Sequence, residues 1–129
     1  MKTILPAVVL SACAFVITAS AQRDYCFKND GLKVTQTVSF TITGTKLEGT
    51  FESGGYVPDT SAETFEFTGR KTGNVLTIKF AGKPPYELPR GTRKITWTFS
   101  PTKLRIPMYG KNYVTMKYSN YTATFTKCK

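Results

Sequence analysis

The segment ETFEFTGRKTGNVLTIKFA, from Glu63 to Ala81, carries the clearest structural signal in the chain. Apolar and polar residues alternate on both sides of the turn sequence Arg70–Gly73. The apolar positions are Phe65, Phe67, Leu76, Ile78 and Phe80. A period of two around a glycine-containing turn predicts a β-hairpin with one apolar face and one polar face. The rest of the chain must cover the apolar face.

The same alternation recurs along most of the remaining chain, and no segment has a helical period of useful length. Further strands are expected at Val34–Ile42, Leu47–Phe51, Ile95–Phe99, Leu104–Ile106, Tyr113–Tyr118 and Tyr121–Phe125, with a short extra one around Tyr25. Other short turns are expected at Thr43–Thr45, Ser100–Thr102 and Ser119–Asn120. Long connections are expected at Ser53–Ala62, Gly82–Arg93 and Pro107–Asn112. The sequence therefore predicts an all-β protein.

About eight strands joined as consecutive hairpins predict an antiparallel up-and-down β-barrel. An open sheet of that size would leave sticky edges, which closure removes. In an oxidising compartment Cys26 and Cys128 are expected to form a disulfide that joins the first strand to the last. A two-sheet β-sandwich remains the alternative.

Residues 1–21 are expected to be a secretory signal peptide rather than part of the fold. A basic start precedes the apolar run Ile4–Ile17, and the small residues Ala19–Ala21 precede the expected cleavage. Residues 22–129 then form a single β-barrel domain, secreted or periplasmic, with no transmembrane span. One alternative is a membrane anchor, although the apolar run is short for a span. Another is a lipoprotein anchored through Cys13, because Leu10–Cys13 resembles a bacterial lipobox.

Positive charge is concentrated in the second half of a chain whose formal net charge is +10. Residues 22–66 contain four basic residues against seven acidic ones, whereas residues 67–129 contain thirteen basic residues against Glu87. Outward positions on neighbouring strands carry Lys79, Lys94, Lys103, Arg105 and Lys117. These side chains form either a basic wall for anionic partners or a solvated face that limits aggregation.

The residues needed for most enzyme chemistry are missing. The chain has no histidine, which excludes a histidine base or metal ligand. The pair Cys26 and Cys128 does not provide a zinc ligand set. The glutamates do not form a glycosidase pair, and no phosphate loop or nucleophile elbow occurs. We therefore expect a non-catalytic protein without a metal or cofactor.

The long connections are expected to leave from one end of the barrel, because turns of a meander alternate between its two ends. Binding residues usually lie on such loops, and a barrel mouth is a common ligand site. The candidate ligand-binding residues are Tyr56, Tyr86, Arg90, Arg93, Tyr109, Lys111 and Tyr113. Tyrosine with arginine or lysine offers stacking faces, hydroxyl groups and positive charge. The alternative is that these side chains only plug the barrel end.

Two functions follow from these patterns. The first is a binding module for a small anionic, sugar-like or apolar ligand at the long-loop end. The alternative is a surface-interaction protein whose basic flank binds anionic polysaccharide or lipid head groups. The secretory leader argues against nucleic acid as the partner. Aromatic residues on the inward set predict a mostly packed interior rather than a lipid-sized cavity.

The layout of strands over Lys33–Lys127 resembles the calycin-type barrels, the lipocalins and their relatives. The lipocalin Gly-x-Trp near the first strand is missing, and the sole tryptophan, Trp97, lies late in the chain. The resemblance therefore implies the fold and transfers no ligand residue. The junction Ala19–Gln22 and the run PPYELPRGT…ITWTFS…IPMYGKNY are similar to small secreted proteins of bacteria, a likeness that implies no activity.

Overall fold

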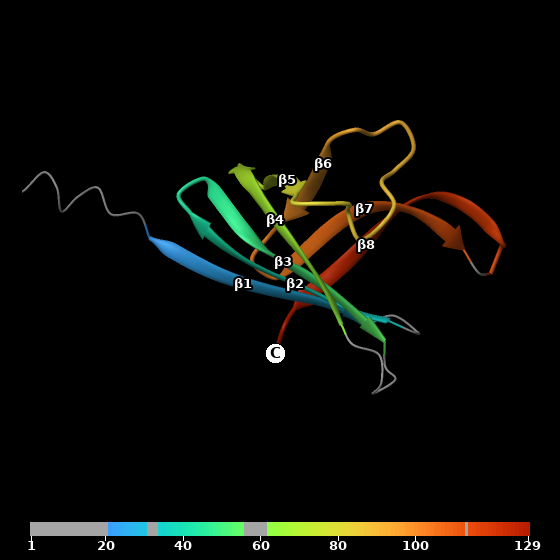
Figure 1. Ribbon diagram of the computed structural model, residues 1–129, viewed down its shortest axis with the longest axis horizontal. Helices are drawn as coiled ribbons and strands as arrows, with labels where there is room; N and C mark the ends of the chain where they lie inside the picture. Colours follow the sequence, from blue (N-terminus) through green and yellow to red (C-terminus); the bar gives the residue numbers. More distant parts are fainter. Residues whose placement is uncertain (1–20, 31–33, 56–61, 113) are drawn as a thin grey trace, which may run out of the picture.

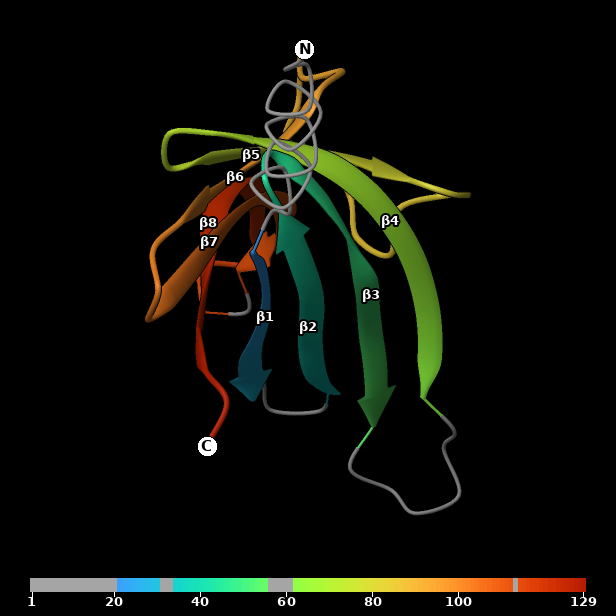
Figure 2. The same cartoon turned by 90° about the vertical axis from the view of Figure 1, so that its left-hand side faces the viewer.

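The eight strands of this protein form one closed antiparallel barrel in which each strand pairs with the next and β8 pairs with β1 (Figures 1 and 2). The computed structural model describes residues 21–30, 34–55, 62–112 and 114–129. The strands are β1 (Gln22–Asp30), β2 (Val34–Thr43), β3 (Lys46–Gly55), β4 (Glu63–Thr72), β5 (Val75–Phe80), β6 (Ile95–Phe99), β7 (Lys103–Asn112) and β8 (Lys117–Lys127). The predicted up-and-down barrel is confirmed. Residues 1–20 of the expected signal peptide lie outside the described ranges.

The hairpin expected from the sequence is β4 and β5. Phe67 lies opposite Phe80, and the ladder closes at Thr72 and Val75. Gly73 follows β4 with a φ of 61°, a left-handed conformation that glycine adopts without steric penalty. The alternating pattern of β5, with Leu76, Ile78 and Phe80 buried, is the inward face predicted for this strand.

Aromatic and aliphatic side chains fill the barrel. The side chains of Phe27, Phe51, Trp97 and Phe125 are almost completely buried. Rings in the core form edge-to-face pairs, such as Phe51 with Phe125 at 6.1 Å and Phe67 with Trp97 at 5.0 Å between centroids. Burial of each such side chain contributes about 1.5–3 kcal/mol. The expectation of a mostly packed interior agrees with this core.

Four expectations for the two ends of the chain were wrong. β1 is a full strand that pairs with β2 from Gln22 to Asp30, rather than a short segment around Tyr25. Pro107–Asn112 is not a connection, because it belongs to β7, and Ser119–Asn120 is not a turn, because it lies inside β8. Val114–Met116 are turn residues between the two strands rather than part of a strand.

Closure of the barrel depends on a narrow seam. In the described chain, β1 and β8 pair at Phe27 with Lys127 and at Lys28 with Thr126. The expected Cys26–Cys128 disulfide lies next to these pairs, with 5.4 Å between the Cα atoms. The amide of Cys128 donates a hydrogen bond of 3.0 Å to the carbonyl of Cys26. The part of the chain that the structure describes holds no helix with the length and hydropathy of a membrane span.

Candidate functional site

The structure separates the residues that were expected to form one site at the long-loop end. Tyr56 and Tyr113 lie outside the described residues. Tyr86 points into the barrel, whereas Arg90, Tyr109 and Lys111 lie on or over the outer face of β7. Arg93 is exposed on the connection between β5 and β6.

Tyr86 closes the barrel end from the inside. Its ring packs against Phe51 and Phe80, with centroids 5.8 and 6.1 Å away. Its hydroxyl oxygen accepts a hydrogen bond of 2.9 Å from Nε1 of Trp97. Burial disfavours the phenolate and raises the pKa of Tyr86 to about 12, although the hydrogen bond from Trp97 partly opposes this shift. This arrangement corresponds to the plug alternative for Tyr86.

Arg90 and Tyr109 form a small cluster on the outside. The guanidinium carbon of Arg90 lies 4.4 Å from the centre of the Tyr109 ring. The Tyr109 ring stacks on Tyr118, with centroids 5.9 Å apart, and Lys111 lies opposite Tyr118 in the ladder. The amide of Arg90 donates to Oδ1 of Asn120 at 2.9 Å. The cluster thus contains three predicted residues, Arg90, Tyr109 and Lys111. It also contains two that were not predicted, Tyr118 and Asn120.

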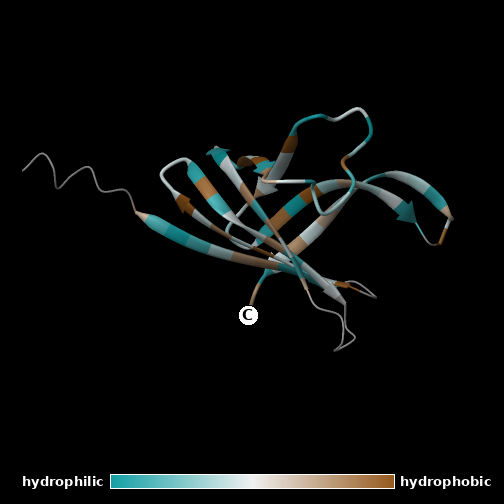
Figure 3. Ribbon diagram, in the orientation of Figure 1, coloured by the Kyte–Doolittle hydropathy of each residue, from teal (hydrophilic) through white to brown (hydrophobic). Residues whose placement is uncertain are grey.

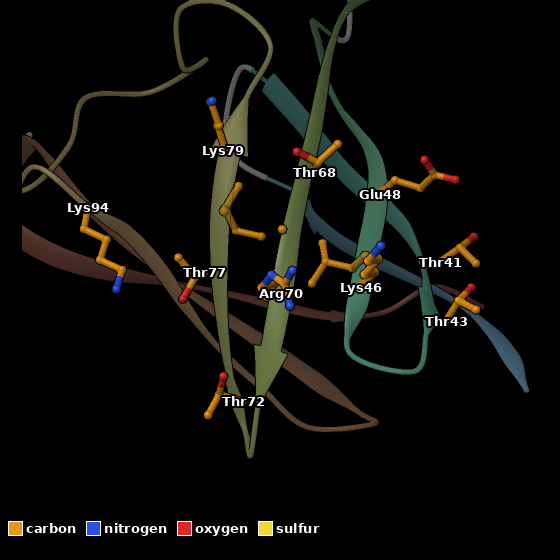
Figure 4. Close-up of a pocket in the computed structure, with 13 residues that line it drawn as sticks. Thr41, Thr43, Lys46, Glu48, Thr68, Arg70, Thr72, Thr77, Lys79 and Lys94 are labelled. Carbon is orange, nitrogen blue, oxygen red and sulfur yellow. The ribbon is translucent and has the colours of Figure 1, made fainter. Parts of the chain in front are cut away.

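A different part of the surface is hollowed. A groove of about 700 Å³ runs over the outer face of β2, β3, β4 and β5 (Figure 4). Its lining consists of threonine hydroxyls, basic side chains, one carboxylate and a few apolar atoms. The residues are Thr41, Thr43, Lys46, Leu47, Glu48, Thr68, Gly69, Arg70, Thr72, Thr77, Ile78, Lys79 and Lys94.

Two cations face each other in the middle of this groove. Lys46 on β3 lies directly opposite Arg70 on β4, and Figure 4 shows the two side chains on neighbouring strands. Like charges in directly opposed positions destabilise a sheet. No described carboxylate lies within ion-pair distance of either residue, and the ion pair found in the described chain joins Lys28 to Asp30 instead. The groove therefore contains positive charge that the described residues do not neutralise.

Threonines continue this row across the sheet. Thr43 lies opposite Lys46, and Thr77 lies opposite Arg70. One step along the strands, Thr68 lies between Glu48 and Lys79. A second groove of about 520 Å³ shares Glu48, Thr68 and Lys79 with the first and extends past Phe80 and Ala81. The two grooves form one polar path across β3, β4 and β5.

The sequence reading identified Lys79 and Lys94 as outward cations but missed Lys46 and Arg70 as a pair. The sequence did indicate that both side chains point outward, because each occupies a polar position in the alternating pattern of its strand. The opposition of Lys46 and Arg70 also requires the register of β3 on β4, which the long connection between these strands does not reveal. Among the described residues there is no group of three or more histidine, cysteine, aspartate or glutamate side chains that would hold a metal ion.

The fold and groove together define an eight-stranded antiparallel barrel, compatible with a lipocalin-like architecture, with a basic groove on its outer wall. Comparison of the chain with protein-family models, with curated proteins and with solved structures found no match.

Proposed function

We propose that this protein is a secreted or periplasmic, non-catalytic module that binds an anionic polysaccharide along the groove over β2–β5. The observation that carries the proposal is the directly opposed pair of Lys46 and Arg70, which have no acidic partner among the described residues. A carboxylate or sulfate group placed between them would remove the repulsion and receive charge-assisted hydrogen bonds.

The shape and lining of the groove favour a sugar polymer over a small enclosed ligand. Thr68, Arg70 and Lys79 are all exposed, so the groove is a shallow surface track rather than an enclosed pocket. Threonine hydroxyls both donate and accept hydrogen bonds, which suits the hydroxyl groups of a sugar. Tyr86 and the surrounding rings occupy the barrel end where a small ligand was first expected.

The compartment supports an extracellular or periplasmic polymer as the ligand. The Cys26–Cys128 disulfide is of the kind that persists in oxidising environments. The amino-terminal sequence has the composition of a secretory leader.

A second candidate keeps the ligand at the loop end. Arg90 over the ring of Tyr109, itself stacked on Tyr118, offers a charged and aromatic platform for a small anionic or sugar-like group. Tyr118 is well exposed, at 61%, so part of this platform is open to solvent. The groove and the loop-end platform can be distinguished by substituting the basic residues of each in turn.

Binding to immobilised dextran sulfate, compared with uncharged dextran, tests the groove. The double variant Lys46→Gln with Arg70→Gln should bind dextran sulfate at least about tenfold more weakly, because two contacts of about 1 kcal/mol each are lost. Wild-type binding should weaken from low to physiological ionic strength, because exposed charges are screened.

The matched control is the double variant Lys103→Gln with Arg105→Gln. It removes the same charge from β7, which lies across the barrel from β3. This control should bind within about threefold of the wild type if the groove is the site. Equal losses in both double variants would show that net charge alone drives binding and would contradict the proposal. If Arg90→Gln weakens binding to dextran sulfate while the Lys46→Gln, Arg70→Gln variant binds like the wild type, the second candidate is supported.

A further inference from the structure

The outer end of the β7–β8 hairpin exposes apolar side chains. Val114 is 92% exposed and Met116 61%, and both lie in the turn between the two strands. Tyr118 and Tyr121 follow on β8 at 61% and 49% exposure. Figure 1 shows this hairpin extending beyond the barrel, and Figure 3 shows hydrophobic colour at its outer end. Exposed apolar groups gathered in one place are typical of interaction sites.

The turn holds these side chains in a defined arrangement. Oδ1 of Asn112 accepts hydrogen bonds from the amides of Val114 at 2.9 Å and Thr115 at 3.2 Å. The carbonyl of Asn112 accepts a further bond of 2.7 Å from the amide of Met116. Hydrogen bonds to Asn112 therefore hold Val114, Thr115 and Met116 in a turn.

Met116 occupies a backbone conformation that disfavours it. Its φ is 61°, and it is the residue other than glycine with a positive φ in the described chain. Glycine or asparagine normally takes such a position, because a left-handed backbone crowds the Cβ of other residues. A methionine in this place gains no backbone stability, and its exposed side chain gains no burial in the free protein. We attribute its presence to a contact that the isolated protein does not make.

The order of side chains along the hairpin matches the layers of a membrane surface. The apolar Val114 and Met116 lie outermost, and Lys117 and Tyr118 follow directly behind them. Tyrosine favours the boundary between hydrocarbon and water, and lysine extends its ammonium group toward the head groups. Lys111 and Lys117 lie at the tip end of the hairpin, Arg90 lies over the ring of Tyr109, and no acidic residue occurs from Lys103 to Lys127. A partner with negative charge around an apolar layer complements this surface.

We propose that the tip of the β7–β8 hairpin inserts into the interface of an anionic lipid bilayer. Val114 and Met116 enter the acyl boundary, while Tyr118 and Lys117 remain at the level of the head groups. The barrel stays in water, because four of the five exposed large apolar side chains of the described residues lie on this hairpin, and the fifth, Val75, lies beside the β4–β5 turn. This surface is separate from the polysaccharide groove, so each proposal can fail without the other.

Co-sedimentation with vesicles tests the insertion. The probes are vesicles of phosphatidylglycerol and phosphatidylcholine in a 3:7 ratio and vesicles of phosphatidylcholine alone. Wild-type protein should sediment with the anionic vesicles and much less with the zwitterionic ones. The double variant Val114→Ser with Met116→Gly keeps every charge, and its partition onto anionic vesicles should fall at least about tenfold. Lys117→Gln should lower it about fivefold, since one cation near an anionic surface is lost.

Two controls separate insertion of the tip from misfolding and from a general loss of exposed apolar surface. Met116→Gly alone relieves the left-handed backbone, so its melting temperature should equal or exceed that of the wild type while its vesicle binding falls. Val75→Ser removes an apolar residue, 38% exposed, beside the β4–β5 turn and should leave vesicle binding unchanged.

Undiminished sedimentation of the Val114→Ser, Met116→Gly variant would overturn the proposal, because charge alone would then explain the binding. Failure of the wild type to sediment with anionic vesicles would overturn it as well. A Trp side chain at the tip provides a direct readout: fluorescence of the Val114→Trp variant should shift to shorter wavelength with anionic vesicles, and an unshifted spectrum would also contradict insertion.

Discussion

At the scale of single residues, the hydrogen bond between Trp97 and Tyr86 is the polar contact that fixes the barrel end. Trp97 is 1% exposed, so its Nε1 has no access to bulk water and depends on the Tyr86 hydroxyl. Leaving a buried hydrogen-bond donor without an acceptor lowers the stability of the fold by about 1–3 kcal/mol. The phenol therefore contributes both its ring and its oxygen to the closure of the barrel.

Tyr86→Phe should lower the free energy of unfolding by about 1–3 kcal/mol at neutral pH, because the Trp97 N–H remains buried without an acceptor. Denaturant unfolding of the two proteins measures this difference. The control is Tyr25→Phe, whose lost hydroxyl has no hydrogen-bond partner among the described residues. Equal effects of the two substitutions would contradict the role given to the bond with Trp97.

Tyr86 also makes the free energy of unfolding depend on pH in the alkaline range. Burial raises the pKa of Tyr86 in the folded protein from its ordinary value of 10.0 to about 12. The unfolded state thus loses this proton first as the pH rises, so the contribution of Tyr86 is complete below about pH 10 and is lost toward pH 12. The difference in stability between the wild type and Tyr86→Phe should therefore shrink over that interval. A constant difference would show that the phenol does not titrate differently in the two states.

At the scale of elements, the β7–β8 hairpin shows why part of the sequence reading failed. Pro107 and Gly110 are typical of loops, yet both lie inside β7. The amide of Tyr109 donates a hydrogen bond to the carbonyl of Glu87, away from β8. Pro107 lies two residues earlier on β7, so its backbone nitrogen points to the same side of the strand. The nitrogen of Pro107 therefore points away from β8, toward the side of β7 that β6 covers only as far as Arg105. The β7–β8 ladder loses no hydrogen-bond donor to the proline. The ring of Tyr121 covers Gly110.

Local patterns predicted three of the four expected short hairpins, because a tight turn fixes the register of the strands beside it. The β4–β5 hairpin and the inward positions of Phe67 and Ile78 followed from Gly73 and the alternation around it. The register of β3 on β4 is set by packing across a long connection, so the opposition of Lys46 and Arg70 was not readable. The sequence also grouped Tyr86 with Arg90, because both lie on the connection between β5 and β6, although Tyr86 packs against the core and Arg90 lies over the ring of Tyr109.

Gly49 allows β3 to lie closely against β2. A Cβ at this position would overlap the carbonyl oxygen of Ser39 and lie 2.6 Å from Cβ of Phe40. Gly49→Ala should therefore lower the free energy of unfolding by at least about 2 kcal/mol, because the overpacked strand must shift. Gly82→Ala is the control, since an added Cβ meets nothing within 4 Å there, and it should change stability by less than about 0.5 kcal/mol. Thermal denaturation of both variants measures the contrast, and similar melting temperatures would contradict this account of the β2–β3 contact.

At the scale of the whole molecule, the barrel presents two chemically different surfaces. The groove lies over β2–β5, and the projecting hairpin is formed by β7 and β8, on the other side of the closed strand order. A polysaccharide on the first surface would not block a bilayer at the second. If both proposals hold, the protein connects a sugar polymer to a membrane, with the packed aromatic core as a rigid spacer.

The seam between β1 and β8 holds these two surfaces in one closed body. Its described ladder consists of Phe27 with Lys127 and Lys28 with Thr126, and the Cys26–Cys128 disulfide spans a sequence separation of 102 residues. Replacing both cysteines by serine should lower the free energy of unfolding by about 2–5 kcal/mol, because the unfolded chain gains the entropy of a long loop. Denaturant unfolding measures the loss, and wild-type protein under reducing conditions should reproduce it.

The disulfide should also act locally at the seam, in addition to the global loss of stability. In the serine variant amides of the β2–β3 ladder should exchange hydrogen faster because global unfolding is easier, and the amides of Phe27 and Lys127 should show a further increase from local opening of the seam. Because the groove is built on β2–β5, its binding of dextran sulfate should survive in the folded fraction. An equal increase in all strands would show the global effect alone and would contradict a separate local opening of the seam.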